Sequence, residues 1–211
     1  MPDMRDLRAA GLDVSRETLQ RLEEFSAELK RWSARINLVA PTPEEIFWER
    51  HIVDSAQLYP LRSDGVIWCD LGSGGGLPAM VVAILAREGA PDLMFHLVES
   101  DARKAAFLKI TSRALALNVV VHQARAETLA PLSAQTVTAR ALAPLDKLLG
   151  YVQRHLDPGG VALLPKGRNH EVEIADARRR WSFDLDLIDS VAEQGAKILS
   201  IRHITSNAGS K

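Results

Sequence analysis

The stretch Asp70-Leu71-Gly72-Ser73-Gly74-Gly75-Gly76-Leu77-Pro78 decides the fold of this chain. It ends a short apolar run that begins at Val66, and it opens a segment with the composition of a helix. A glycine-rich turn from a strand into a helix lies at the carboxyl end of the strand, where open α/β sheets bind ligands. Four glycines in five positions exceed what a tight turn requires, so the run predicts a ligand-binding loop.

The glycine spacing excludes two common nucleotide sites. A dinucleotide site, G-x-G-x-x-G, would need glycine where the chain has Leu77 or Ala79, and no Gly-Lys-Ser/Thr of a P-loop follows. The observed pattern, D-x-G-x-G-x-G, is similar to the first motif of the Rossmann-like methyltransferases. In those enzymes the loop packs against the amino-acid part of S-adenosylmethionine, a cofactor without a pyrophosphate.

Strand and helix patterns alternate after the loop, which predicts an α/β fold with a mostly parallel sheet covered on both faces. Helices are expected over 78–87, over 101–117 and between the third, fourth and fifth strands. The last two strands should form an antiparallel pair with a turn near Gly195. We therefore predict a Rossmann-like S-adenosylmethionine-dependent methyltransferase fold, seven-stranded with an antiparallel last strand. The expected strands cover 66–71, 94–100, 119–124, 135–140, 160–166, 184–191 and 197–204.

The first sixty residues have a helical pattern. A second helix should begin with Thr42 as its N-cap, Pro43 in the first turn and Glu45 completing a capping box, and should run to about Leu58. We expect residues 1–63 to form an N-terminal helical extension packed on the core, residues 64–205 the methyltransferase domain and residues 206–211 a flexible tail. The first helix carries one apolar stripe, formed by Leu19, Leu22, Phe25, Leu29, Trp32 and Ile36.

Composition indicates a globular protein with a hydrophobic core, since 46% of residues are hydrophobic and 25% are charged. The single cysteine, Cys69, cannot form an internal disulfide and is expected to be a buried residue of the first strand. The N-terminus lacks the apolar segment of a secretory signal, and no apolar run is long enough to span a membrane. We therefore expect a cytoplasmic protein with no membrane partner.

Charge is unevenly distributed along the chain. Residues 103–180 hold 13 Lys and Arg against 6 Asp and Glu, a net charge of +7. The remaining residues hold 13 against 21, a net charge of −8, which gives −1 in total. The basic stretch is either a surface that faces phosphates or a set of solvated helix charges, and the sequence leaves both open.

Polar side chains are expected at the carboxyl ends of four strands. Glu99 follows the second strand, where a carboxylate can accept hydrogen bonds from both ribose hydroxyls. Glu127 follows the third strand, where an acid and the backbone can frame an adenine. Arg140 and Lys166 end the fourth and fifth strands, and such cations can hold a phosphate or stack on a base. The alternatives are exposed loop acids and surface salt bridges.

The chain also lacks several catalytic signatures. Adenine-amine methylation usually shows an N-P-P-Y-like element, but residues 138–144 read Thr-Ala-Arg-Ala-Leu-Ala-Pro. We interpret Cys69 as a buried core residue and not as a nucleophile. No His/Cys cluster has metal-ligand spacing, so no metal is expected. The absence of an acid–base residue suits an acceptor such as guanine N7, which has an in-plane lone pair and no proton to remove. Catalysis would then depend on alignment and desolvation.

An ordered set of motifs extends this pattern over about residues 15–205. The chain resembles the bacterial 16S rRNA guanine-N7 methyltransferases, the glucose-inhibited division protein B family. One departure is Ala79, where the family often has glycine, and we expect that its methyl group only tightens helix packing. The resemblance rests on Trp32, Ile36-Asn37-Leu38, Arg50-His51-Ile52-x-Asp54-Ser55, the glycine loop, Val98-Glu99-Ser100, Lys104-x-x-Phe107-Leu108, Arg125-x-Glu127, Thr138-Ala139-Arg140-Ala141 and Lys166-Gly167.

The resemblance implies roles for individual positions. A histidine on a predicted helix, such as His51, is more often a satisfied structural residue, and Trp32 and Trp48 are expected in the core. No residue is assigned as an acid or base. The implied cofactor site comprises Asp70, Gly72, Gly74, Gly76, Leu77, Glu99, Ala126, Glu127 and Arg140. Residues expected near the entry of the substrate guanine are Arg125, Arg140, Lys166, Arg50, His51 and Asn37.

The expected function is transfer of a methyl group from S-adenosylmethionine to N7 of a guanine in 16S ribosomal RNA, by a monomer that acts on a ribosomal particle. One alternative is a methyltransferase for a small molecule or a protein. Another is a module that binds cofactor or RNA without turnover. The basic stretch favours RNA, and the intact glycine loop and Glu99 favour an enzyme.

Overall fold

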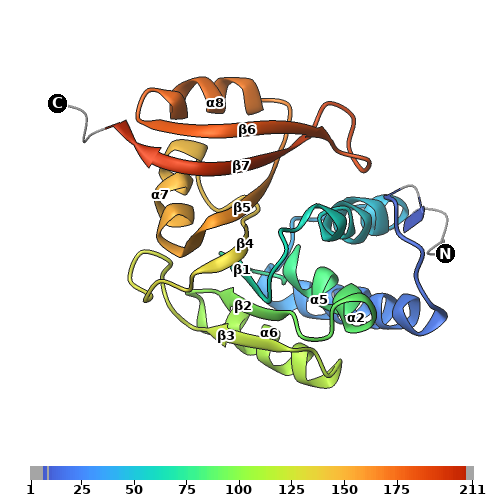
Figure 1. Ribbon diagram of the computed structural model, residues 1–211. Helices are drawn as coiled ribbons and strands as arrows, with labels where there is room; N and C mark the ends of the chain where they lie inside the picture. Colours follow the sequence, from blue (N-terminus) through green and yellow to red (C-terminus); the bar gives the residue numbers. More distant parts are fainter. Residues whose placement is uncertain (1–6, 9, 208–211) are drawn as a thin grey trace.

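A computed structural model describes residues 7–8 and 10–207 of the chain, and it contains one seven-stranded sheet of order β3-β2-β1-β4-β5-β7-β6 (Figure 1). Neighbouring strands from β3 to β5 pair in parallel, and β7 runs antiparallel to both β5 and β6. This confirms the predicted fold class and its antiparallel last strand. The strands are β1 (Ile67–Leu71), β2 (Met94–Val98), β3 (Val119–His122), β4 (Ala134–Thr138), β5 (Leu156–Lys166), β6 (Trp181–Asp189) and β7 (Lys197–Ser206).

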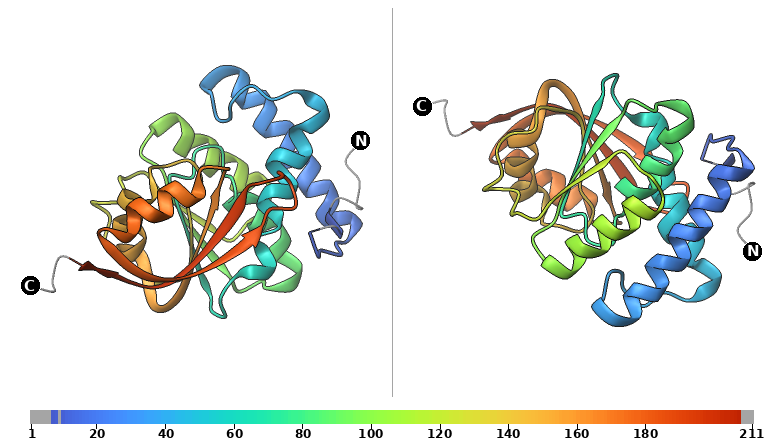
Figure 2. Two further views of the ribbon diagram at one scale, coloured as in Figure 1. Left: turned by 90° about the horizontal axis from the view of Figure 1, so that it is seen from above. Right: turned by 90° about the horizontal axis from the view of Figure 1, so that it is seen from below.

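Helices cover both faces of the sheet. On one face, α5 and α6 join α2 in a core that includes Phe25 and Phe107, and Figure 2 shows α2 alongside these two helices. On the other face, α7 and α8 form a second core that includes Leu148 and Ala177. The helical segments are α2 (Arg16–Ile36), α3 (Glu44–Phe47), the π-helix η1 (Trp48–Val53), α4 (Asp54–Ala56), the 3₁₀-helix η2 (Tyr59–Leu61), α5 (Ala79–Gly89), α6 (Ala102–Ala114), α7 (Leu145–His155) and α8 (His170–Arg178).

The strand β1 explains how the two cores are separated. Successive side chains of a strand point to opposite faces, so Trp68 enters the core beneath α2 while Cys69 enters the core beneath α7. Cys69 is fully buried, as expected. The next residue, Asp70, is also fully buried and lies directly before the glycine loop.

Helix α2 forms as its apolar stripe predicts. The Ser15 side chain accepts a hydrogen bond from the Thr18 amide at the N-terminus, and Asn37 ends the helix in the left-handed conformation at φ 49°. Trp32 packs against Phe107 of α6 with ring centroids 5.6 Å apart. The stripe therefore belongs to the same hydrophobic core as one face of the sheet.

The prediction of the second helix is wrong about its first residue and about its being a regular α-helix. It begins at Glu44 with Pro43 in the cap position, and Thr42 does not cap it. The Thr42 hydroxyl instead donates to the carbonyl of Ala40, 2.9 Å away. Residues 48–53 form a π-helix between α3 and α4, a wider turn that the apolar periodicity could not reveal.

Further expectations about the connections and the C-terminus need correction. The described residues 123–133 contain no helix between β3 and β4, because the amides of Thr128 and Leu129 form only one turn on the carbonyl of Arg125 before Pro131. Helix α8, between β5 and β6, was not predicted. The expected tail overlaps β7, which extends to Ser206, and residues 208–211 lie outside the described part. Among the described residues, no helix has the length and apolarity needed to cross a membrane.

Candidate active site

A cavity of about 1400 Å³ opens where β1, β4 and β5 end. The chain moves outward from β1 to β2 and β3 and then returns to β4, so the topological switch point lies between β1 and β4. The walls come from the glycine loop, the segment 46–54, the residues after β4, the end of β5 and the loop between β6 and β7. Segments far apart in the sequence therefore form a single site.

The glycines of the loop divide into two kinds. Gly72 and Gly74 have φ values of 68° and 53° and line the cavity. Among the described residues, a Cβ on Gly74 would approach only the carbonyl oxygen of Gly72, at 3.7 Å, so this backbone faces open space. A Cβ on Gly72 would collide with Leu142. Gly76 does not line the cavity, and a Cβ there would collide with Met80 and crowd Leu108. Gly76 thus allows helix packing, whereas Gly74 leaves room for a ligand.

Glu99 connects the second strand to this loop. One carboxylate oxygen accepts a hydrogen bond from the Gly74 amide at 2.8 Å, and the other accepts one from the Asp101 amide at 2.8 Å. The side chain is almost buried. Glu99 itself does not line the cavity, and each of its carboxylate oxygens keeps a second lone pair.

Asp70 lies beneath the loop and does not form part of the cavity wall. One carboxylate oxygen accepts a hydrogen bond from the Thr138 hydroxyl at 2.6 Å, while the other has no partner among the described residues. Burial raises the pKa of Asp70 to about 7, although the bonds from Thr138 and Ser73 and the charge of Arg140 oppose the shift. Asp70 is a buried acceptor next to a cradle of glycine backbone.

The residues after β3 lie on the Glu99 side of the site. The Ala124 amide donates to the carbonyl of Glu99 at 3.2 Å, and the nearly buried Ala126 carbonyl accepts from His155 Nε2 at 2.8 Å. Arg125 and Glu127 form an exposed pair at 3.7 Å. None of these residues lines the cavity, so the structure does not bring Arg125 to the expected entry of the substrate.

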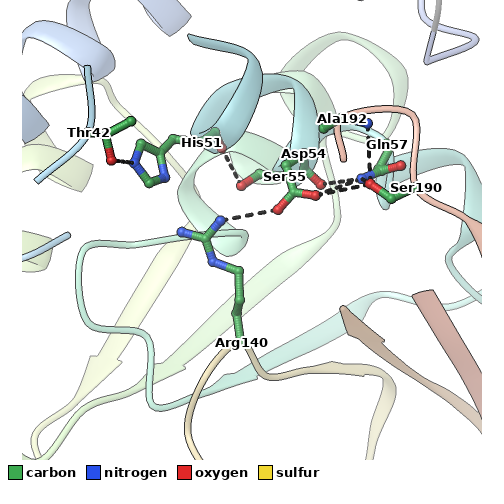
Figure 3. Close-up of polar contacts among 8 residues, drawn as sticks. All are labelled: Thr42, His51, Asp54, Ser55, Gln57, Arg140, Ser190 and Ala192. Atoms are coloured by element: carbon green, nitrogen blue, oxygen red, sulfur yellow. Dashed lines mark hydrogen bonds and ion pairs between the residues drawn. The ribbon is translucent and has the colours of Figure 1, made fainter. Parts of the chain in front are cut away.

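Arg140 and Lys166 both line the cavity, and both are engaged in ion pairs. Arg140 lies 3.2 Å from Asp54, and the two side chains are 22% and 19% exposed (Figure 3). Lys166 lies 2.7 Å from Glu173 and is 10% exposed. The salt bridges weighed as alternatives therefore exist, but they are partly buried in the cavity wall and not on the open surface.

His51 is a buried residue at the edge of the same cavity. The Thr42 hydroxyl uses its proton on the carbonyl of Ala40, so His51 Nε2 donates to it over 3.1 Å. Burial, together with the charges of Arg140 and Arg50, lowers the pKa of His51 to about 4. His51 is therefore neutral at pH 7, and its ring packs edge-on against Phe47.

Asn37 was predicted near the substrate entry, and Asp54 was not assigned a role. Asn37 caps α2 and is exposed, and it does not line the cavity, although its neighbour Leu38 does. The sequence interpretation did not assign a role to Asp54, which pairs with Arg140. The available signal was the motif Arg50-His51-Ile52-x-Asp54-Ser55, in which Asp54 lies one helical turn from the cavity residue Arg50.

Comparison with known proteins identifies relatives over almost the whole chain. The ribosomal RNA small subunit methyltransferase G of Ruegeria sp. (strain TM1040) is 48% identical over 193 residues, covering 92% of this chain and 94% of the relative. The protein of the same name from Paramagnetospirillum magneticum is 46% identical over 193 residues, covering 91% and 92%. A crystal structure of an S-adenosylmethionine-dependent methyltransferase from Aquifex aeolicus superposes with a TM-score of 0.57 at 12% identity, covering 83% of this chain and 97% of that one, which shows a shared fold. The model of the family described as rRNA small subunit methyltransferase G matches residues 18–205. The chain belongs to this rRNA small subunit methyltransferase G family.

Proposed function

We propose that this chain transfers a methyl group from S-adenosylmethionine to N7 of a guanine in 16S ribosomal RNA. One observation carries the proposal: a single cavity joins the backbone of Gly72 and Gly74, of which Gly74 faces open space, to a wall that holds Arg140. Membership of an rRNA methyltransferase family supports the reaction class and the substrate class.

The residues present fit S-adenosylmethionine. Gly72, Gly74 and Leu77 would contact its amino-acid part, since they line the cavity and a side chain on Gly74 would fill it. Glu99 would accept the ribose hydroxyls, and the partnerless oxygen of Asp70 supplies a buried acceptor below an ammonium group. The segment that holds Ala126 and Glu127 would frame the adenine. When bound, the cofactor supplies an electrophilic methyl group on a sulfonium.

The chain's own residues act by alignment and not by acid–base chemistry. The neutral His51 donates its ring N–H to Thr42 and has a lowered pKa, which suits a structural residue better than an acid. A guanine attacked at N7 becomes cationic, so the positive Arg140 cannot stabilise the ring by charge. Arg140 would instead hold a carbonyl or phosphate oxygen of the substrate, or fix the cofactor. Alignment and exclusion of water would provide the rate enhancement.

The RNA substrate is proposed to be presented by a ribosomal particle in the cytoplasm and bound by a monomer. The net charge of −1 indicates modest attraction to free RNA. Moreover, the basic stretch does not form one surface. Its lysines and arginines on α6 lie on the face of the sheet opposite those on α7 and α8.

The test is mass spectrometry of 16S rRNA fragments from cells with and without the protein, followed by reactions of the purified protein with naked 16S rRNA and with small subunits. We expect one N7-methylguanine that requires the protein, with faster methylation of the particle. An unchanged set of modifications would contradict the proposal. Methylation of a protein or a small molecule in the same reactions would establish the alternative enzyme, and cofactor binding without any transfer would establish a non-catalytic module.

A further inference from the structure

Three distant segments meet at the side chain of Asp54 (Figure 3). One carboxylate oxygen pairs with Arg140 Nη1 at 3.2 Å, at the end of β4. The other oxygen accepts from Gln57 Nε2 at 2.9 Å and lies 3.5 Å from the Ser190 hydroxyl, in the loop between β6 and β7. Asp54 itself follows the π-helix η1. Both oxygens are therefore engaged, and the orientation of the carboxylate is fixed.

This arrangement also orders the loop between β6 and β7. Gln57 donates to Ser190 at 3.1 Å and accepts from the Val191 amide at 3.0 Å, while the Ala192 amide donates to the Ser190 hydroxyl at 3.2 Å. Ser190 and Ala192 line the same cavity as Arg140 and Asp54. The network around Asp54 thus joins two walls of the cavity.

We propose that Asp54 is a positioning residue for methyl transfer, which holds the Arg140 guanidinium in the cavity in the orientation that the substrate complex requires. The inference rests on the proposed function. Asp54 uses one N–H of the guanidinium, and an arginine has five, so Arg140 keeps donors for an oxygen of the substrate or cofactor.

Energetics favour positioning over a purely stabilising role. Asp54 and Arg140 are each about one-fifth exposed, so both charges are largely removed from water. Such pairs contribute little net stability compared with apolar residues of the same size, because desolvation offsets the attraction. A partly buried arginine without a fixed partner would sample several orientations, and a small misplacement of an aligning group lowers the rate strongly.

The test compares Asp54→Asn and Asp54→Glu with the wild type, using methylation of small ribosomal subunits, cofactor affinity by calorimetry and thermal unfolding. Asp54→Glu keeps the charge but shifts the carboxylate by one methylene, which protects the fold while moving Arg140. We expect each variant to lower kcat/KM roughly ten- to hundredfold. Asp54→Glu should do so with little change in melting temperature, whereas Asp54→Asn should also lower the melting temperature, because it leaves the partly buried Arg140 charge without its partner. The matched control is Asp146→Asn, which removes the exposed pair with Arg180 at 3.3 Å outside the cavity and should leave kcat/KM unchanged.

A double-variant cycle identifies the route of the effect. If Asp54 acts through Arg140, then Asp54→Asn should cause no further loss of kcat/KM in an Arg140→Ala background. Additive losses, or Asp54→Glu with wild-type kcat/KM, would overturn the positioning role. A wild-type protein that methylates no ribosomal substrate would instead contradict the proposed function, so the two failures are distinguishable.

Discussion

Gly74 and Gly76 share a left-handed backbone and differ in their surroundings. The φ values are 53° and 80°, so an alanine at either position should cost about 1–2 kcal/mol of stability in backbone strain. Only Gly76 adds a collision with Met80 and Leu108. Alanine at Gly76 therefore tests packing, whereas alanine at Gly74 tests ligand binding.

We predict that Gly74→Ala weakens S-adenosylmethionine binding by about 1–3 kcal/mol, because its methyl group would occupy cofactor space. Gly76→Ala should lower the melting temperature more than Gly74→Ala does. Calorimetry and thermal unfolding of both variants provide the test. A folded Gly74→Ala protein with wild-type cofactor affinity would remove Gly74 from the proposed cofactor site.

Asp70 gives a prediction about pH. Its pKa in the folded chain is about 7 against an ordinary value of 3.8, so the folded protein binds this proton more tightly than the unfolded chain. The contribution of Asp70 to the free energy of unfolding therefore falls as pH rises from about 4 to about 7. Asp70→Asn removes this dependence, so its melting temperature should rise relative to that of the wild type between pH 5 and pH 8.

The comparison must be made as a difference, because His51 acts in the same pH range with the opposite sign. Its lowered pKa means that stability is lost as pH falls from about 6.5 towards 4. Both proteins carry His51, so its contribution cancels when their unfolding curves are subtracted. A difference in melting temperature that does not change with pH would show that Asp70 is ionised throughout the range.

At the scale of elements, the π-helix η1 and the loop between β6 and β7 meet at the cavity. The helix segment supplies Arg50, His51 and, at its end, Asp54, and the loop is held through Gln57. π-Helical turns are rare and frequently occur at functional sites. This joint is where the N-terminal extension contributes to the site.

We expect Gln57→Ala to release the loop without unfolding the sheet. Loss of the bond between Gln57 and the Val191 amide should increase hydrogen exchange at residues 191–192 and lower stability by about 1 kcal/mol. The control is Gln153→Ala, which removes a bond of 2.9 Å to the Ile204 carbonyl elsewhere on β7. Unchanged exchange at residues 191–192 in the Gln57 variant would show that the loop is ordered by other contacts.

At the scale of the whole molecule, we expect the positions of the basic side chains, and not the net charge of the chain, to decide how it binds the phosphates of a substrate. Lys104 of α6 lines the cavity, whereas Arg179 follows α8 on the opposite face of the sheet and is highly exposed. Phosphates of a substrate whose base enters the cavity would pass close to Lys104. The two positions offer the same charge change at different distances from the site.

We predict that Lys104→Glu weakens binding to small ribosomal subunits severalfold and reduces its salt dependence, while Arg179→Glu has a smaller effect. Binding measured at several salt concentrations tests this, with melting temperatures to verify folding. Equal losses in the two variants would indicate non-specific attraction over the whole surface.

The sequence alone determined the order of the seven strands and the place of the glycine loop. Local patterns were sufficient for this, because the alternation of apolar strands with amphipathic helices and the glycines between Asp70 and Leu77 are short-range signals. The same patterns could not reveal the π-helix or the absent helix before β4. Those depend on a shift in backbone hydrogen bonds and on a short connection, neither of which changes the apolar periodicity.

The tertiary structure alone decided which charged side chains meet. Arg140 and Asp54 are 86 residues apart, and Gln57 and Ser190 are 133 apart, so no local pattern could pair them. Folding also left some residues of the predicted site outside the cavity. Arg125 pairs with Glu127 at the surface, and Gly76 packs against Met80 and Leu108. Contacts between distant segments depend on the geometry of the sheet edge, and this is why the sequence located the glycine loop while only the fold brought together the residues that line the cavity.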